Sequence, residues 1–412
     1  MNDFSTIIIG GGIAGLTCAK YLNEKGVGFL VLEASDALGG RVRTDVVDGF
    51  RLDRGFQVLL TNYPEARKTL NYNGLRLKTF ESGSMIRHNK GFMKMDNPFR
   101  KPSAFLSMAF SPVGSFGDKL KIRKLINEVN DINEDDFFNQ SDTDTLTFLK
   151  NYGFSDKIIE RFFKPFFGGV FIENELATSS NFFQFTFKQF FKGDAALPAE
   201  GMQRIPEQIA EYIPENRIRK NARVKGIEGN QVFLDGGEVL TADRIVLATE
   251  AIGADNLLNE NTSRDYNVTT CTYFSAEFSP LKDSGKYLVL NPNRRSSVHH
   301  LCVPSDISSE YAPAGKTLIS VSTQGQEKLD ERNLVGRIKR ELFEWFGAQV
   351  NVWKHIQTYH IPESLVKYPP NSPKQNLKIS ENLYRCGDYL AYPSLNAAMQ
   401  TGREVASMIT EM

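Results

Sequence analysis

The chain has 412 residues, of which 41% are hydrophobic and 24% charged. These proportions are typical of a globular protein and exclude a disordered chain, a collagen-like repeat and a coiled coil. Lysine plus arginine and aspartate plus glutamate each number 49, so the chain lacks the basic excess that nucleic-acid binding needs. The length favours two or three domains, and no run reaches the roughly 18 apolar residues of a membrane-spanning helix.

The four cysteines are Cys18, Cys271, Cys302 and Cys386, and they lie far apart without a C-x-x-C pair. This spacing predicts neither a disulfide framework nor a metal site, and it favours reduced thiols in a cytoplasmic protein. The N-terminus carries Asp3 rather than the basic residues of a secretion signal, and it runs directly into a glycine-rich turn. We therefore expect the first residues to belong to the fold.

The N-terminal residues have the pattern of a strand, a helix and a second strand. Residues 6–9 are a short β-branched run ended by three glycines, which predicts a buried strand of a parallel sheet. Apolar residues then recur at helical spacing from Ile13 to Leu22, and Gly26 provides a C-cap. Residues 29–32 follow as a second buried strand, so the pattern predicts a βαβ unit.

Two distant segments have the same character as this unit. We predict further short strands at residues 222–224, 231–234, 245–248 and 383–386. A helix follows the last of them, with an apolar face that extends from Ala398 to Ile409. These pieces predict one nucleotide-binding domain that is discontinuous in sequence, formed by residues 1–75, 200–262 and 365–412.

The intervening segments have a different composition. Residues 76–199 carry helical patterns and a concentration of phenylalanine, whereas residues 263–364 alternate as strands before a helix near residues 334–346. We expect them to form a second domain, part sheet and part helix. The predicted fold class is therefore α/β, with a Rossmann-like domain and a second α+β domain for the substrate.

The segment from Gly10 to Gly15 reads G-G-G-I-A-G and fits G-x-G-x-x-G between the predicted strand and helix. Its glycines allow a pyrophosphate to approach the helix N-terminus, where unpaired N–H groups favour negative charge. Glu33 closes the second strand 18 residues after Gly15, where it would accept hydrogen bonds from ribose hydroxyls. This context predicts a dinucleotide site.

Two further motifs suit the same ligand. Residues 39–44 read G-G-R-V-R-T, and two guanidinium groups there can hold a diphosphate, although a basic surface loop is the alternative. Near the C-terminus, Gly387 and Asp388 end a strand and residues 393–398 begin a helix. An aspartate at this position can bind a polyol, and a helix N-terminus can stabilise negative charge on a reduced ring.

These three motifs, in this order, resemble those of the flavin-containing amine oxidase, protoporphyrinogen oxidase and phytoene desaturase superfamily. The resemblance implies that FAD is the cofactor, with its ADP half at the first motif and Glu33, its diphosphate at Arg41, its ribitol at Asp388 and its flavin above the last helix. It also implies that Val224 meets the adenine. The candidate cofactor-binding residues are Gly10, Gly12, Ile13, Ala14, Gly15, Glu33, Ala34, Gly39, Gly40, Arg41, Val224, Ala248, Thr249, Gly387, Asp388, Ser394, Asn396, Ala397 and Ala398.

The chain departs from parts of the superfamily at two points. Members that oxidise amines usually place an aromatic residue where this chain has Ser394, with Tyr392 two residues earlier, and this difference disfavours an amine substrate. Covalent flavin attachment in some relatives uses a cysteine of this region, but residues 387–398 contain none, so we expect FAD to be non-covalent. A second G-x-G-x-x-G for NADPH is also absent, which argues against a disulfide reductase.

Flavin oxidation of a C–H bond needs little from side chains, because flavin N5 accepts the hydride while the protein aligns the substrate. Arg54 and Gln57 follow the G-G-R segment, and with Tyr392 they are our candidates for catalytic contacts. Tyr359 is a further candidate. The pair His299 and His300 has two interpretations, as a general base or as structural residues.

Phenylalanine is concentrated between Phe154 and Phe191, which hold 12 of the 30 in the chain. From Phe162 to Phe167 the spacing predicts one broad aromatic helix face. This face either belongs to the core or lines an apolar tunnel for a lipid-like substrate. Four further apolar residues could form the opening of such a tunnel and contact a membrane surface: Phe105, Leu106, Met108 and Phe110.

These patterns predict an FAD-dependent oxidoreductase of the dehydrogenase or desaturase kind, which dehydrogenates or isomerises a small apolar organic molecule by hydride transfer to flavin N5. Its electron acceptor is not indicated by any motif. One alternative is a flavin amine oxidase that releases hydrogen peroxide. An alternative of another class is a non-redox protein that uses FAD as a structural or sensing ligand.

Overall fold

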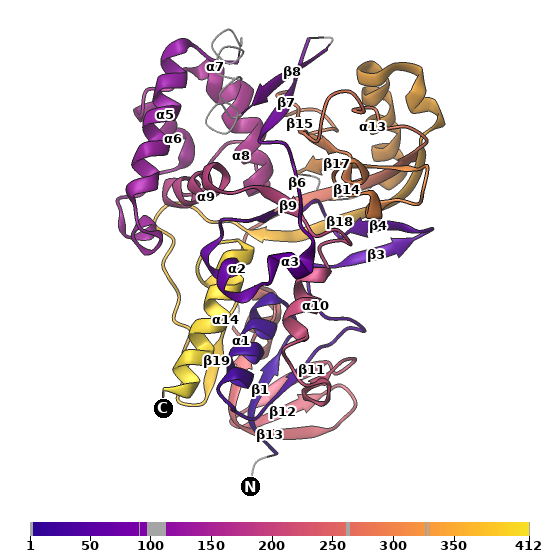
Figure 1. Ribbon diagram of the computed structural model, residues 1–412. Coiled ribbons are helices and arrows are strands. Elements are labelled where there is room, and N and C mark those ends of the chain that lie inside the picture. The colour runs from indigo at the N-terminus through magenta and orange to yellow at the C-terminus, as the bar shows by residue number, and fades with distance from the viewer. Residues whose placement is uncertain are drawn as a thin grey trace.

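The computed structural model describes residues 3–89, 91–96, 113–260, 264–325, 328 and 330–411. Figure 1 shows two lobes, with both chain ends on the lower one. A mixed sheet, seven-stranded within the described residues, forms the centre of the lower lobe in the order β10-β2-β1-β13-β12-β11, with β19 beside β13. Its strands are β1 (Phe4–Ile9), β2 (Phe29–Leu32), β10 (Ile218–Arg219), β11 (Val224–Glu228), β12 (Gln231–Leu234), β13 (Val239–Leu247) and β19 (Leu383–Arg385).

Strand β1 pairs in parallel on both sides, since Ile7 lies opposite Leu30 of β2 and Ile245 of β13. All of β2 and the last four residues of β1 are buried, as expected of parallel strands that are covered on both faces. The predicted βαβ unit is confirmed. The strand expected over residues 222–224 begins instead at Val224, because the Ala222 N–H bonds the Glu33 carbonyl outside the ladder.

Helices α1 (Ile13–Glu24) and α14 (Leu395–Thr410) pack side by side against this sheet (Figure 1). Their contact is close at Gly402, where an added Cβ would lie 2.3 Å from the Ala14 carbonyl oxygen. A larger residue at position 402 would therefore push the two helices apart. Because α14 is the last helix and α1 the first, the lower lobe is assembled from both ends of the described chain.

The upper lobe contains a second sheet, seven-stranded in the described ranges, with the order β18-β14-β17-β16-β15-β7-β8. It is antiparallel except between β15 and β7, and Thr269 pairs with Gln324 where β14 meets β17. Four of its strands, β14 to β17, lie within residues 263–364, where the alternation predicted strands. The strands are β7 (Gly83–His88), β8 (Gly91–Asp96), β14 (Tyr266–Ala276), β15 (Leu288–Leu290), β16 (His300–Cys302), β17 (Thr317–Gln324) and β18 (Lys354–Val366).

Helices with a phenylalanine-rich core form the other side of the upper lobe (Figure 1). Phe162 stacks on Phe166 with ring centroids 5.5 Å apart, and Phe163 stacks on Phe167 at 6.2 Å, so the expected aromatic helix face is present. A π-helical turn, η2, leads into α8 and sets the angle of this face. The helices are α5 (Phe116–Asp131), α6 (Thr145–Asn151), α7 (Asp156–Ile158), η2 (Ile159–Phe163), α8 (Lys164–Phe171) and α9 (Ser180–Lys192).

A three-stranded sheet joins segments on both sides of the expected domain boundaries. Ala196 of β9 (Ala195–Leu197) pairs with Leu59 of β5 (Leu59–Leu60) and with Thr79 of β6 (Lys78–Thr79). The division near residues 75 and 199 therefore stays a prediction. The remaining elements are β3 (Thr44–Val47), β4 (Phe50–Asp53), α2 (Pro64–Thr69), α3 (Tyr72–Leu75), η1 (Glu134–Asn139), α10 (Arg204–Ala210), η3 (Glu215–Arg217), α11 (Ala251–Leu258), α12 (Pro304–Ile307), η4 (Ser309–Tyr311), α13 (Glu331–Phe346), η5 (Gly347–Val352) and η6 (Asp388–Leu390).

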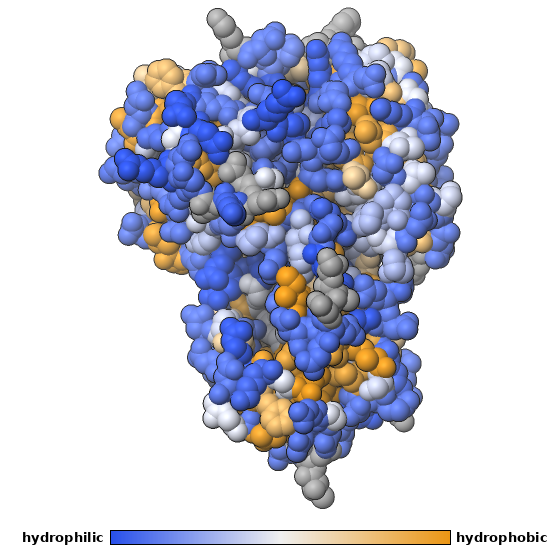
Figure 2. All heavy atoms as spheres, turned by 180° about the vertical axis from the view of Figure 1, so that it is seen from behind, coloured by the Kyte–Doolittle hydropathy of each residue, from blue (hydrophilic) through white to orange (hydrophobic). Residues whose placement is uncertain are grey.

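Hydrophilic side chains cover most of the face seen in Figure 2, with hydrophobic side chains gathered mainly on the lower lobe and in patches of the upper one. Within the described ranges, no helix combines the length and the apolar character needed to cross a bilayer. The apolar residues at positions 105–110, expected to approach a membrane, lie outside the described residues.

Asp53 is a buried residue at the end of β4, and hydrogen bonds connect it to other segments of the chain. Its side chain accepts hydrogen bonds from the Met202 N–H at 2.9 Å and from the Tyr311 hydroxyl at 2.9 Å, while its carbonyl accepts one from Tyr273 at 2.8 Å. Burial nevertheless raises its pKa from the ordinary 3.8 to about 6, because the charged form loses its hydration.

This raised pKa predicts that the protein loses stability as the pH rises from about 4 to about 6. The folded state holds the proton of Asp53 up to about pH 6, whereas the unfolded chain releases it near 3.8, so the free energy of unfolding falls through this window. The difference corresponds to about 3 kcal/mol. We expect Asp53→Asn to flatten the dependence of Tm on pH. The control Asp48→Asn, at an exposed position, should leave that dependence unchanged. A Tm profile that both variants share with the wild type would contradict this.

Candidate active site

A cavity of about 1070 Å³ lies between the carboxyl ends of the first sheet and the second sheet with its helices. All three sequence motifs reach it. The predicted cofactor-binding residues among its lining are Gly10, Gly12, Ile13, Ala14, Glu33, Ala34, Gly39, Gly40, Arg41, Val224, Ala248, Thr249, Gly387, Asp388, Ser394 and Ala398. The strand order thus brings together segments that are up to 388 positions apart, from residue 10 to residue 398.

The first motif presents the N-terminus of α1 to the cavity. Gly12 is the N-cap, and no side chain caps this helix, so the N–H groups of its first turn remain available to an anion. A Cβ at Gly12 would project into open space, whereas one at Gly15 would lie 2.1 Å from the Gly10 carbonyl oxygen. Gly12 therefore leaves room for a ligand, and Gly15 serves the packing of helix on strand rather than the cavity wall.

The Glu33 carboxylate is held in a fixed orientation at the end of β2. One oxygen accepts a hydrogen bond of 2.8 Å from the Gly11 N–H, and the other accepts bonds from the Ser35 N–H at 2.8 Å and from the Ser35 hydroxyl at 2.7 Å. These bonds keep a buried anion beside the glycine turn, with lone pairs left for hydroxyl donors. Such an arrangement suits the ribose of a dinucleotide.

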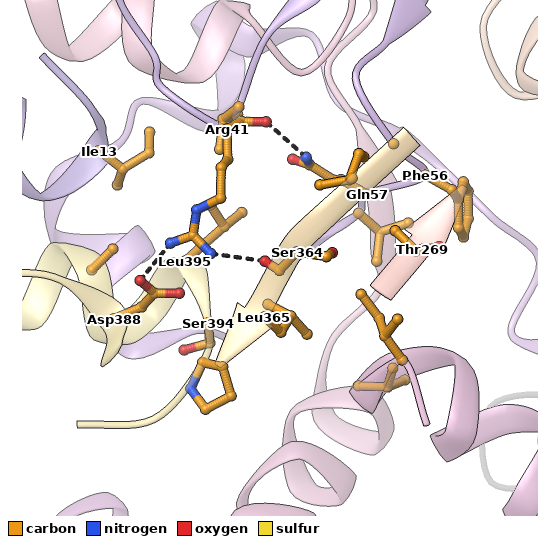
Figure 3. A pocket seen from close by; sticks show the side chains of 18 of the residues that line it. Ile13, Arg41, Phe56, Gln57, Thr269, Ser364, Leu365, Asp388, Ser394 and Leu395 are labelled. Atoms are coloured by element: carbon orange, nitrogen blue, oxygen red, sulfur yellow. Dashed lines mark hydrogen bonds and ion pairs between the residues drawn. The ribbon is translucent and has the colours of Figure 1, made fainter. Parts of the chain in front are cut away.

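Arg41 and Asp388 meet at the cavity wall from opposite ends of the chain, as Figure 3 shows. The Arg41 guanidinium lies 2.5 Å from an Asp388 carboxylate oxygen and also donates to the Ser364 carbonyl at 2.9 Å. The negative charge of Asp388 raises the pKa of Arg41 above its ordinary value. A fixed cation and a buried carboxylate therefore stand side by side, as a diphosphate followed by a polyol requires.

The start of α14 faces the cavity through Ser394 and Ala398. Ser394 is the N-cap, and its hydroxyl accepts a hydrogen bond from the Ala397 N–H at 3.0 Å. Neither Asn396 nor Ala397 lines the cavity. The Asn396 side chain accepts a hydrogen bond from the Glu65 N–H at 3.0 Å and donates one to the Tyr392 hydroxyl at 2.8 Å. Only the backbone of Asn396 is therefore free to make the expected contact with FAD.

Two of the predicted catalytic side chains line the cavity. Gln57 donates to the Arg41 carbonyl at 3.0 Å, which fixes its amide beside the G-G-R segment (Figure 3). Arg54 forms a paired hydrogen bond with Asp45, at 2.8 and 2.9 Å, and Tyr359 donates to the same carboxylate at 2.8 Å. Arg54 is therefore held by its neighbours, while Tyr359 lies outside the cavity lining. Their catalytic roles stay predictions.

The placement of Tyr392 in the catalytic site is wrong. Its side chain is buried and does not line the cavity, because it packs into the helical core, stacked on Phe138 with ring centroids 4.5 Å apart. Its hydroxyl is engaged by Asn396 at 2.8 Å. The sequence places its backbone near the cofactor, but the side chain turns away from it.

The two histidines differ in position. His299 lies outside the cavity lining and its ring accepts a hydrogen bond from the Gln324 N–H at 3.1 Å, whereas His300 lines the cavity. Burial lowers the pKa of His299 to about 4 and that of His300 to about 3, so both rings are neutral near pH 7. Such low pKa values make each ring a weak base whose protonated form is costly at neutral pH, so a general-base role is disfavoured for either.

Both interpretations of the phenylalanine cluster apply, each to different residues. Phe163, Phe183 and Phe187 are completely buried in the core. Six members of the cluster face the cavity instead: Phe162, Phe166, Phe167, Phe182, Phe190 and Phe191. Phe56 and Phe80, from outside the cluster, join them there. The far end of the cavity is thus largely aromatic and is formed by α8, α9 and the segment after β4.

One wall of the cavity was not predicted from the sequence. It is formed by alternate residues of the second sheet, among them Thr269, Ser322 and Gln324. The period-two alternation of β17 was the available signal, but only the strand pairing shows which of its faces meets the cavity. Among the described residues no group of three or more His, Cys, Asp or Glu side chains is placed to hold a metal ion.

The family model for "Flavin containing amine oxidoreductase" matches residues 13–410. The chain belongs to this family. It is accordingly an enzyme, an FAD-dependent oxidoreductase with an α/β fold and a Rossmann-type FAD-binding domain. FAD is the cofactor, and it is non-covalent: the four cysteines are all buried and free, and none is among the residues that line the cavity.

Similar proteins span several reactions. An L-amino-acid oxidase of Sistrurus catenatus edwardsii is 25% identical over 278 residues, covering 61% of this chain and 52% of its own. A carotenoid 3,4-desaturase of Haloarcula japonica is 45% identical over 58 residues, covering 13% of this chain and 12% of its own. These matches thus span about half or less of the relatives' lengths. The crystal structure of a putative protoporphyrinogen oxidase from Exiguobacterium sp. 255-15 is similar in fold, with a TM-score of 0.77, 16% identity, and coverage of 100% of this chain and 99% of that one.

Proposed function

We propose that this flavoenzyme dehydrogenates or isomerises a small, uncharged, largely apolar organic molecule. The observation that carries the proposal is the aromatic end of the cavity, which adjoins the motifs for FAD and is lined by eight phenylalanine rings. Apolar surface gains about 25 cal/mol for each Å² that leaves water, so such a wall favours a polyene or an alicyclic ring. The similarity to a carotenoid desaturase and to a putative protoporphyrinogen oxidase supports the same class.

An amine would find little compensation for lost hydration in this cavity. Asp388 is paired with Arg41, and the Glu33 carboxylate is already bonded within its turn. Glu81, Asp96 and Asp194 of the lining each have a partner already. The two remaining acidic residues, Glu250 and Glu363, are exposed and lie beside Thr249 and Ser364 on the cofactor side of the cavity. A buried ammonium group without a free carboxylate is costly, which disfavours an amine substrate.

FAD, when bound, supplies a hydride acceptor at N5. The protein holds the cofactor, orients the substrate and excludes water from the site. Arg41, Glu33 and Asp388 would fix the cofactor, and Gln57, bonded to the Arg41 carbonyl, would keep its amide at the junction between cofactor and substrate. The rings of α8 and α9 would align the substrate and keep water from the reacting carbon.

The four free cysteines support the expectation of a cytoplasmic location.

The test is anaerobic reduction of the purified holoenzyme with polyenes, porphyrinogens and primary or secondary amines, followed by flavin absorbance. We expect bleaching or spectral change with the apolar compounds first. Oxygen or a quinone added afterwards shows which acceptor restores the oxidised spectrum. Rapid bleaching by amines alone would instead favour the flavin amine oxidase, an alternative to which the L-amino-acid oxidase match gives support. A flavin that no donor reduces would favour the non-redox alternative.

A matched pair of variants separates the cavity wall from the core. Phe166 lines the cavity, whereas Phe183 is completely buried beside it. We expect Phe166→Ser to weaken the response to apolar ligands by about tenfold while FAD stays bound. Phe183→Ser should instead lower the stability by about 3–5 kcal/mol, as loss of a buried phenylalanine does. Equal ligand responses in Phe166→Ser and the wild type would contradict the proposed substrate site.

A further inference from the structure

Three polar side chains form a strip on the sheet wall of the cavity, where the sheet packs against α8. His300 of β16 pairs directly with Ser322 of β17, and Gln324 lies two residues further along β17, on the same face. Their exposed fractions are 4%, 8% and 7%. The strip is thus a built part of the cavity, shielded from solvent.

His300 lines this cavity and has one ring nitrogen free to accept a hydrogen bond. Its Nε2 lies 2.7 Å from the Pro165 carbonyl oxygen, which can only accept, so Nε2 carries the ring hydrogen and Nδ1 keeps a free lone pair. The ring lies directly against Gly169, where an added Cβ would come within 2.3 Å of its Cε1 atom. Because burial keeps the ring neutral, Nδ1 accepts and does not donate near pH 7.

The neighbouring groups of the strip are neutral as well. The Gln324 amide donates to the Gly168 carbonyl at 2.8 Å, and its oxygen accepts from Arg294. This pairing fixes the amide and leaves its oxygen with one further lone pair. The Ser322 hydroxyl can donate or accept. The strip therefore offers fixed acceptors and one adaptable hydroxyl, with no full charge.

We propose that the strip of His300, Ser322 and Gln324 selects substrates that carry a neutral hydroxyl group on an apolar skeleton. This inference rests on the proposed function and narrows its substrate class. A hydroxyl satisfies the His300 acceptor while the skeleton packs on the phenylalanine rings. The corresponding hydrocarbon leaves that acceptor without a partner, and the corresponding ammonium ion meets no carboxylate in the strip.

Three compounds with one skeleton test this: phenylcyclohexane, 4-phenylcyclohexanol and 4-phenylcyclohexylamine. Each is titrated into the oxidised holoenzyme at pH 7.5, with the flavin difference spectrum and the ligand-induced shift in Tm as two readouts. One hydrogen bond of ordinary strength corresponds to roughly threefold to tenfold in affinity, so the alcohol should bind that much more tightly than the hydrocarbon. The amine should bind most weakly.

His300→Phe should bring the ratio of alcohol to hydrocarbon affinity close to one. Ser322→Ala removes the hydroxyl of the strip but keeps the His300 acceptor, so it should lower the ratio in part, with FAD content unchanged in both variants. His355→Phe, a histidine of β18 outside the cavity lining, is the control and should keep the wild-type ratio. The smaller Ser322→Ala change keeps the test valid if His300→Phe fails to fold. Binding of both neutral compounds with no preference, or a preference that survives both variants, would overturn the role of the strip and leave the proposed function standing. Tightest binding of the amine would overturn the proposed function itself.

Discussion

Replacement of Glu33 by alanine lowers the affinity for FAD by about ten- to hundredfold. A hydrogen bond to a charged group contributes about 1.5–3 kcal/mol, and every 1.4 kcal/mol is a factor of ten. The change also removes the acceptor of the Gly11 N–H, so the glycine turn loses part of its support. The affinity is measured by titrating the apoprotein with FAD and following the quenching of flavin fluorescence.

Two controls accompany this variant. Glu228→Ala removes an exposed carboxylate of β11 that does not line the cavity, and it should leave the affinity unchanged. Glu33→Gln preserves the shape of the side chain and should lose less than Glu33→Ala. An unchanged affinity in Glu33→Ala would show that the cofactor's ribose does not lie at the end of β2.

The second large effect concerns the pair formed by Arg41 and Asp388. We expect Arg41→Ala and Asp388→Asn each to purify with depleted flavin, with affinity lowered about tenfold or more. The first loses the cation beside the diphosphate and leaves the buried Asp388 carboxylate without its partner. The second removes the carboxylate that would hold the ribitol.

The double variant distinguishes the two contributions. If the groups act as a pair, Arg41→Ala/Asp388→Asn loses less FAD affinity than the sum of the single losses, and its Tm lies above that of Arg41→Ala, since no buried charge is left alone. The flavin-to-protein absorbance ratio and the Tm of each apoprotein measure these effects. Full flavin occupancy in both single variants would contradict the placement of the diphosphate and the ribitol.

Much of the nucleotide-binding lobe could be predicted from local patterns. The turn from Gly10 to Gly15, the acid that ends β2 and the Gly387–Asp388 segment each depend on backbone geometry that a few neighbouring residues determine. Parallel strands then bring these segments to one sheet edge. The family resemblance that these motifs carry placed Glu33, Arg41 and Asp388 around one ligand, and the structure brings all three to one cavity.

Side-chain direction could not be predicted in the same way. Tyr392 and Ser394 are two residues apart, yet the first packs against Phe138 in the core and the second lines the cavity. The polar strip presents a similar problem, because His300 and Ser322 are adjacent only through the register of β16 on β17. Long-range pairing of this kind leaves little trace in local sequence, and the phenylalanine cluster divides between core and cavity for the same reason.

The contact of α1 with α14 also constrains the order of events during synthesis. Residues 13–24 leave the ribosome before Gly402, so the contact between Ala14 and Gly402 forms only after the whole intervening chain has been made. Likewise, the second parallel pairing of β13 forms only after β19 has been made. The part of α1 that α14 covers thus stays without its partner until α14 has been made, and exposed apolar surface of this kind is prone to aggregation. The cofactor lobe is therefore completed late, and the FAD site is fully formed only after α14 has docked.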